Sequence, residues 1–145
     1  MQEQQARHLF ERARVATLGT VTADGLPHLV PVVFAVAGGR VYTAVDDKPK
    51  STRHLRRLDH VRARHRASLL VDGYDEDWTR LWWVRVDGDA DVVDATTAPG
   101  DTGIRALVGK YPQYTEAAPA GPVIVVRPRR WIWWSSREHE SDRAG

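Results

Sequence analysis

Alternation of apolar and polar positions governs most of the chain after residue 14 and predicts a mostly β protein. Segments with this pattern occupy residues 15–21, 28–36, 40–45, 66–72, 81–88 and 89–94, and residues 123–127 continue into 131–135. Turn signals at residues 22–25 and 38–39 separate the first three segments, so these three are expected to form a meander. Gly88 is expected in a turn between the segments 81–88 and 89–94, and residues 96–102, which contain Pro and Gly, are expected to form a connection. Pro27 and Pro31 cannot donate to a strand ladder, which predicts that the second strand lies at a sheet edge or is bulged.

Helical spacing appears in three places. Residues 2–14 carry Leu9, Phe10 and Ala13 on one side, residues 52–64 carry apolar positions three apart, and residues 103–111 fit a short helix. Six or seven strands with antiparallel links and three added helices indicate a β-barrel, closed or split. We expect one domain over residues 1–137 and a disordered tail at 138–145.

Composition limits the partners and the chemistry. The chain has 145 residues, 42% of them hydrophobic and 28% charged, with a net charge of +2 and no cysteine. A charge this small gives no support to a polyanionic partner, and the absence of cysteine excludes disulfides and thiolate chemistry. The polar N-terminal segment is neither a secretory signal nor a membrane span, so a cytoplasmic location is expected.

A lysine-bearing loop at residues 46–50 is the strongest chemical signal. The chain has 18 Arg but three Lys, and two of these, Lys48 and Lys50, lie two positions apart just before the predicted helix. Ammonium groups, the hydroxyls of Ser51 and Thr52, and free amides at a helix start together indicate a phosphate-binding loop. The alternative is a solvated surface loop.

Six tryptophans form two clusters, at residues 78–83 and 131–134. Trp131 and Trp133 are expected on one face of a strand, while Trp82 and Trp83 face opposite ways. These rings either fill the barrel core and a subunit interface, or Trp82, Trp83, Trp131 and Trp133 contribute to the wall of a substrate cavity.

Several other chemistries have no support in the sequence. The histidines show no metal-ligand spacing, and the acidic run at residues 75–77 lacks the pattern of a calcium loop. Motifs of hydrolases and of nucleotide-binding loops are missing. The predicted helix at 52–64 is rich in Arg, but the nearly neutral chain makes nucleic acid a poor candidate.

The ordered set of motifs resembles the flavin- and deazaflavin-binding split-barrel family, the pyridoxamine phosphate oxidase-like proteins. The matching segments are residues 15–21, 24–28, 31–34, 52–57, 66–72 and 84–88. The run at residues 46–50 is most similar to the branch that uses the deazaflavin coenzyme F420.

This resemblance implies a homodimer with cofactor sites at the subunit interface. It implies phosphate contacts by Lys48, Lys50, Ser51 and Thr52, although relatives often have a basic residue where this chain has Ser51. It also implies that four residues flank the tricyclic ring, namely Val32, Val33, Thr43 and Ala44.

The function expected from the resemblance is that of an F420-dependent oxidoreductase that exchanges hydride with a small organic substrate. An FMN-dependent oxidase of the same fold and a non-catalytic deazaflavin-binding protein are the alternatives. No catalytic residue is assigned, because the cofactor carries the redox chemistry. If a side chain protonates the product, Tyr42 and His28 are candidates, and solvent can serve equally well.

Overall fold

The computed structural model describes residues 1–46 and 55–137. The helices are α1 (Glu3–Arg12), α2 (Arg56–Arg64) and α3 (Ala98–Lys110), with short 3₁₀ turns η2 (Trp78–Arg80) and η3 (Pro112–Tyr114). The strands are β1 (Ala16–Val21), β2 (Pro27–Val32), β3 (Ala35–Ala37), β4 (Arg40–Ala44), β5 (Arg66–Gly73), β6 (Trp82–Val93) and β7 (Val123–Ser135). None of the helices in this part of the chain combines the length and apolar character that a membrane crossing requires.

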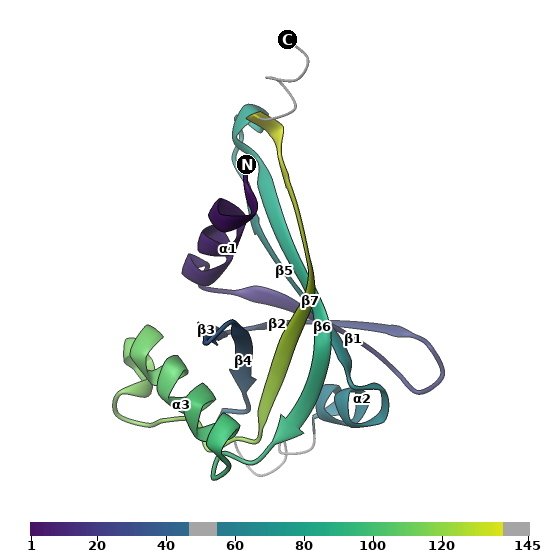
Figure 1. Ribbon diagram of the computed structural model, residues 1–145, viewed down its shortest axis with the longest axis vertical. Helices are drawn as coiled ribbons and strands as arrows, with labels where there is room; N and C mark the ends of the chain where they lie inside the picture. The colour runs from purple at the N-terminus through teal and green to yellow at the C-terminus, as the bar shows by residue number, and fades with distance from the viewer. Residues whose placement is uncertain (47–54, 138–145) are drawn as a thin grey trace.

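Seven strands of the described chain form one antiparallel sheet in the order β2-β1-β5-β6-β7-β4-β3. The fold is mostly β with three added helices, as the sequence predicted. The sheet curls strongly (Figure 1). The curl follows from one connection: β2 ends at Val32 on one edge and β3 begins at Ala35 on the other. Three residues span at most about 11 Å, so the two edges must approach each other there. This is the geometry of a split barrel.

The predicted three-stranded meander is wrong. β1 pairs with β2 and β3 pairs with β4, but the two hairpins lie at opposite edges of the sheet. The apolar run at 28–36 is therefore not one strand, because Val33 and Phe34 cross between the edges. The expectation from the prolines is confirmed: Pro27 and Pro31 both lie in β2, which is an edge strand.

β6 is one continuous strand where the sequence predicted two, and β7 continues from residues 123–127 into 131–135 as predicted. Gly88 was expected in a turn between two strands, but it lies at a β-bulge, where the register between β6 and β7 shifts. A Cβ on Gly88 would lie 2.3 Å from the carbonyl oxygen of Arg127, so only glycine allows this close backbone approach. Pro128 lies opposite Gly88, beyond the segment in which β7 pairs with β4, so its missing N–H breaks no bond to β4.

Two of the helices begin at positions that differ from the prediction. α3 starts at Ala98 because the hydroxyl of Thr97 accepts a hydrogen bond from the N–H of Gly100 (3.1 Å), so residues 98–102 are helical and not a connection. α2 starts at Arg56 after Leu55, later than the predicted residue 52.

The apolar core lies inside the curl and is covered by the helices. α1 packs against β6 and β7, and α2 packs against β1 and β6 through the buried Leu58 and Val61. α3 covers β3 and β4, where Leu107 is fully buried (Figure 1).

Ion pairs along β6 are expected to make stability depend on pH. The guanidinium group of Arg127 lies 2.6 Å from one carboxylate oxygen of Asp91, and Nδ1 of His65 lies 3.0 Å from the other. Hydrogen bonding by Arg127 is the main reason that the pKa of Asp91 lies below its usual value. The stabilisation is therefore present above the unfolded-state pKa, near 3.8, and is lost as pH falls through the lower folded-state pKa. Unfolding in urea from pH 7 to pH 3 should show a smaller loss of stability for Asp91→Asn than for the parent chain.

Candidate functional site

A pocket of ≈ 470 Å³ lies where the two sheet edges approach each other. Its wall comes from the start of β1, the end of β2, the crossing to β3, the end of β4 and the start of α2. The lining residues are Val15, Pro31, Val32, Val33, Thr43, Ala44, Val45, Asp46, Leu55 and Arg57. The four residues that the resemblance placed beside a cofactor ring, Val32, Val33, Thr43 and Ala44, thus lie together in one pocket.

The pocket is lined by the two residues that flank residues 47–54, the segment that contains Lys48 and Lys50. Asp46 and Leu55 both line it, and they are the last described residue before residues 47–54 and the first after them. The other predicted cofactor ligands, Lys48, Lys50, Ser51 and Thr52, lie outside the described residues, and their roles stay predictions.

Hydrogen bonds from Tyr111, directly after α3, and from Thr43 of β4 fix the segment that crosses from β2 to β3 and forms one wall of the pocket. The hydroxyl oxygen of Tyr111 accepts the N–H of Phe34 (3.2 Å) and lies 3.0 Å from the carbonyl oxygens of Phe34 and Arg14, either of which can accept its proton. Thr43 donates to the carbonyl of Val33 at 2.8 Å. The crossing segment lies outside the regular strand ladder, so these bonds satisfy backbone groups that would otherwise be unpaired.

Arg57 supplies a cation to this mostly apolar pocket and was missed by the sequence analysis. Burial lowers the pKa of Arg57, while the nearby Asp46 opposes this effect. Tyr114 donates a hydrogen bond to Asp46, and burial, then this bond, raises the pKa of Tyr114. The sequence placed Arg57 among many arginines on one helix, and its only distinguishing signal is its place in the first turn of α2.

Replacing Arg57 by Ala should weaken the binding of an anionic ligand in this pocket. A hydrogen bond to a charged group contributes about 1.5–3 kcal/mol, so the Kd should rise by roughly 10- to 100-fold. Arg56→Ala is the matched control, because Arg56 is exposed and does not line the pocket. Titration followed by the ligand's own fluorescence measures both; equal Kd values for the two variants would contradict a role for Arg57.

The tryptophans lie at several different places. Trp82, Trp131 and Trp133 pack against the main core, and Trp131 meets Phe10 edge-on with 5.2 Å between ring centres. Trp83 is on the opposite face, directly across from Trp134 of β7. Trp82 also lines a cavity of ≈ 570 Å³ that shares Val15 with the candidate pocket. A substrate role for the four predicted tryptophans stays a prediction.

Neither candidate proton donor lies in the wall of the pocket. Tyr42 is buried in the core between β4 and α3, where a Cβ on Gly103 would lie 2.6 Å from its ring. His28 packs against His60 instead. Within residues 1–46 and 55–137, no group of three or more His, Asp or Glu side chains is placed to hold a metal ion.

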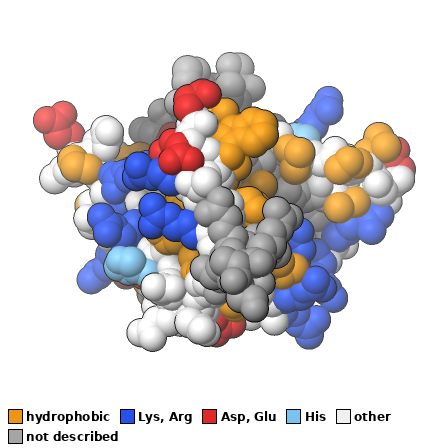
Figure 2. Space-filling view, turned by 90° about the horizontal axis from the view of Figure 1, so that it is seen from above, with side chains coloured by type: hydrophobic (Ala, Val, Ile, Leu, Met, Phe, Trp, Pro, Cys, Tyr) orange, Lys and Arg blue, Asp and Glu red, His pale blue; other side chains and the backbone are white. Residues whose placement is uncertain are grey.

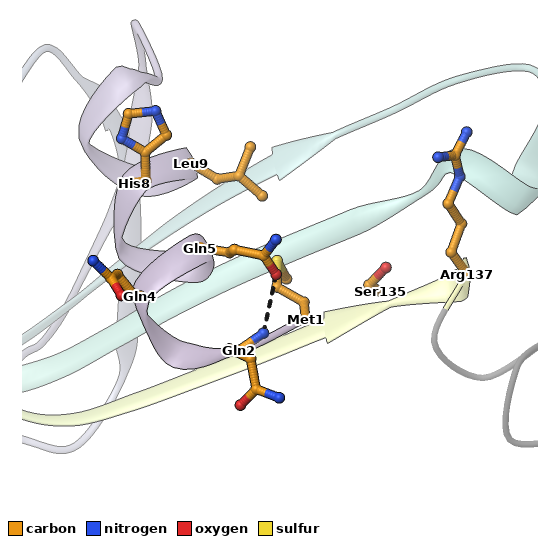
Figure 3. A pocket seen from close by; sticks show the side chains of 8 residues that line it. All are labelled: Met1, Gln2, Gln4, Gln5, His8, Leu9, Ser135 and Arg137. Atoms are coloured by element: carbon orange, nitrogen blue, oxygen red, sulfur yellow. Dashed lines mark hydrogen bonds between the residues drawn. The ribbon is translucent and has the colours of Figure 1, made fainter.

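A larger cavity of ≈ 920 Å³ lies between α1 and the end of β7. Figure 3 shows the amide side chains of Gln2, Gln4 and Gln5 on the α1 side, with Ser135 and Arg137 across from them. It contains none of the residues predicted to contact a cofactor, so the smaller pocket is the better candidate.

Comparisons with known proteins agree with this geometry. The family model described as pyridoxamine 5'-phosphate oxidase matches residues 2–135. No functionally curated protein matches the chain.

Three solved structures show similar folds. A conserved hypothetical protein from Mycobacterium tuberculosis is 22% identical, with 97% of this chain and 88% of that one covered and a TM-score of 0.72. The heme storage protein HutZ from Vibrio cholerae is 11% identical (92% and 93% covered, TM-score 0.71). An FAD-binding protein from Mesorhizobium loti is 17% identical (92% and 94% covered, TM-score 0.67). Because the family model spans nearly the whole chain and the curled sheet has the same fold, this protein belongs to the pyridoxamine 5'-phosphate oxidase-like split-barrel family.

Proposed function

We propose that this protein is an F420-dependent oxidoreductase that holds the deazaflavin in the pocket between the two sheet edges. The observation that carries the proposal is that Val32, Val33, Thr43 and Ala44 converge on one pocket, which the two residues that flank residues 47–54 also line. A flavin-type cofactor is supported more broadly by the family and by the similarity to the FAD-binding protein from Mesorhizobium loti.

The residues of the pocket fit a flat ring with an anionic tail. Its volume of ≈ 470 Å³ lies within the range of small-molecule sites, and Val15, Val32, Val33, Ala44 and Val45 give it apolar walls. Arg57 offers a positive charge at one side. Asp46 would repel an anion, but its charge is balanced by Arg57 and by the hydrogen bond from Tyr114.

The protein's own contribution is binding, orientation and exclusion of water. F420 when bound supplies hydride transfer at its ring. The valines would exclude water from a bound ring, and the crossing at Val33 and Phe34, fixed by hydrogen bonds, gives the wall a defined position. Lys48, Lys50 and Arg57 would hold the anionic tail. None of the described lining residues is assigned to proton transfer, and solvent is the proton source in this proposal.

FMN and a non-catalytic binding role are the alternatives. A storage role is favoured by one observation, the similarity to the heme storage protein from Vibrio cholerae. Heme itself fits this pocket poorly, because none of its described lining residues is the His, Cys, Met or Tyr that ligates heme iron.

We also propose that the protein forms a homodimer through the outer face of the sheet. Hydrophobic side chains gather on the β1–β2 hairpin, at the right of Figure 2. Leu29 is 72% exposed and Leu26 is 59% exposed, and Leu70 of β5 is also exposed on the outer face. Exposed apolar area of this kind marks an interface, and a second copy is the partner that the family resemblance favours. Light scattering should give twice the chain mass, and a monomer at micromolar concentration would contradict the proposal.

Titration of the purified protein with F420 and, separately, with FMN tests the function. We expect saturable binding of F420 and turnover of the reduced cofactor with an electron acceptor. Preferential binding of FMN would establish the FMN alternative, and binding of F420 without turnover would establish the storage role. Absence of binding to both would refute the proposed pocket.

A further inference from the structure

Two histidine rings are packed against each other where α2 meets the β1–β2 hairpin. The ring centres of His28 and His60 lie 4.9 Å apart and the planes meet at 74°. His60 is 7% exposed, and its Nδ1 lies 2.8 Å from the hydroxyl of Thr20. Among the described residues, Nδ1 of His28 is the one buried side-chain nitrogen or oxygen without a hydrogen-bond partner. The site therefore suits a neutral His60 ring better than a charged one.

The charged groups around this pair are engaged elsewhere or offset one another. On α2, Asp59 favours a charged His60 whereas Arg56 opposes it. On the hairpin, Asp24 is bonded by Thr22 at 2.6 Å. From β6, Asp91 is bonded by Arg127 and faces His65. Arg64 donates to the carbonyls of Thr22 and Ala23, at 2.9 and 2.8 Å.

The balance of these effects disfavours a proton on His60. Burial is the largest cause and the neighbouring His28 the second, and together they lower the pKa of His60 below 6.5. Above the ordinary pKa of histidine, His60 is neutral in both states and costs the folded state no stability. As pH falls below that value, the unfolded chain takes up a proton more readily than the folded chain, so the folded state loses stability.

The helix that carries His60 also forms part of the candidate pocket. Arg57 precedes His60 by three residues, so the two side chains lie on neighbouring positions of one helix face. Arg57 and Leu55 line the pocket, whereas Leu58 and Val61 anchor the helix to the core. A movement of α2 away from the hairpin would thus move the cationic wall of the pocket.

We propose that the His28–His60 pair makes the docking of α2 pH-dependent, so that acidification separates the rings, loosens the helix and weakens ligand binding. The link to ligand binding rests on the proposed function. The loosening of α2 does not, because it follows from the contacts of the two rings alone.

Amide hydrogen exchange of the ligand-free protein at pH 7.5 and pH 5.5 tests the loosening. After correction for intrinsic exchange rates, protection of Leu58 and Val61 should fall severalfold at the lower pH, because a proton on His60 favours the undocked helix. His28→Phe keeps a ring against His60 and removes the second cause of the lowered pKa, so the change should be smaller than in the parent chain. His60→Gln removes the titrating ring itself and should show little change. His8→Phe, at an exposed position of α1, is the matched control and should behave as the parent chain.

Three results would overturn the proposal. One is equal protection of α2 at both pH values in the parent chain. The second is an equal loss in the parent and in either variant. In His60→Gln it would mean that another group is responsible, and in His28→Phe it would mean that burial of His60 acts without the pair. If His28→Phe does not fold, His60→Gln serves instead, since it retains a polar group for Thr20 and removes the titrating ring. The third is an unchanged Kd for the ligand despite a loosened α2, which is measured by titration.

The same proteins titrated with FMN and F420 at both pH values test the link to the pocket. We expect a weaker Kd at pH 5.5 for the parent chain, a smaller change for His28→Phe and the smallest for His60→Gln, because the apparent Kd rises as the docked fraction of α2 falls. A loosened α2 with an unchanged Kd would refute the link. Absence of binding at either pH would refute the proposed function, while the exchange experiment would still decide whether the histidine pair releases α2.

Discussion

Replacing both Lys48 and Lys50 by Ala is expected to abolish measurable binding of F420 and of FMN while leaving the fold intact. Each charge-assisted hydrogen bond to a phosphate contributes about 1.5–3 kcal/mol, so losing two should raise the Kd by roughly 100-fold or more. Asp46 and Leu55, which flank the segment with both lysines, line the pocket, and Arg57 alone should not compensate. Isothermal titration with each cofactor provides the measurement.

The matched control for this variant removes two positive charges elsewhere. Arg40 and Arg62 are both exposed and neither lines the pocket, so Arg40→Ala with Arg62→Ala should bind as the parent chain does. Circular dichroism should show the same β-rich spectrum for all three proteins. Undiminished affinity in the lysine variant would show that the pocket, or its anionic ligand, is wrongly placed.

Replacing Phe34 by Ala should have the largest effect on stability, with a loss of about 3–5 kcal/mol. Phe34 is fully buried at the crossing between the two sheet edges, and its ring lies 4.9 Å from that of Phe10. The ammonium group of Lys110 lies 3.8 Å from the centre of the ring. Burial, followed by the nearby Arg14, lowers the pKa of Lys110 to about 8. Urea unfolding of the parent chain and the variant measures the loss.

A comparison with Phe10→Ala separates stability from pocket shape. Phe10 is as deeply buried as Phe34, so its loss should cost a similar free energy, but it lies in α1 and does not line the pocket. At a temperature where both variants are folded, Phe34→Ala should bind cofactor more weakly than Phe10→Ala, because Val33 beside it loses its fixed position. Equal affinities would show that the crossing does not shape the site.

Local patterns predicted the elements well where neighbours in sequence decide them. Alternation located β1, β4 and β5, and the two prolines of β2 predicted an edge strand because a missing N–H excludes a central position. Helix starts were less accurate. Thr97 was available as an N-cap for α3, but the Pro and Gly residues that follow it were interpreted as a connection. Gly88 was interpreted as a turn, and its role in a bulge depends on Arg127, nearly forty residues away.

The candidate site, too, was predictable from the sequence only in part, because some of its features depend on neighbours in sequence and others on distant residues. The sequence by itself determined the alternation that builds a mostly β chain, the edge position of β2, and, through resemblance, the four residues that share the pocket. Only the tertiary structure decided that β2 and β3 lie at opposite edges, that Arg57 faces the pocket, and that His28 meets His60. The physical reason is that alternation fixes which face of a strand is buried, whereas the partner of each strand depends on how the whole sheet curls to cover its core.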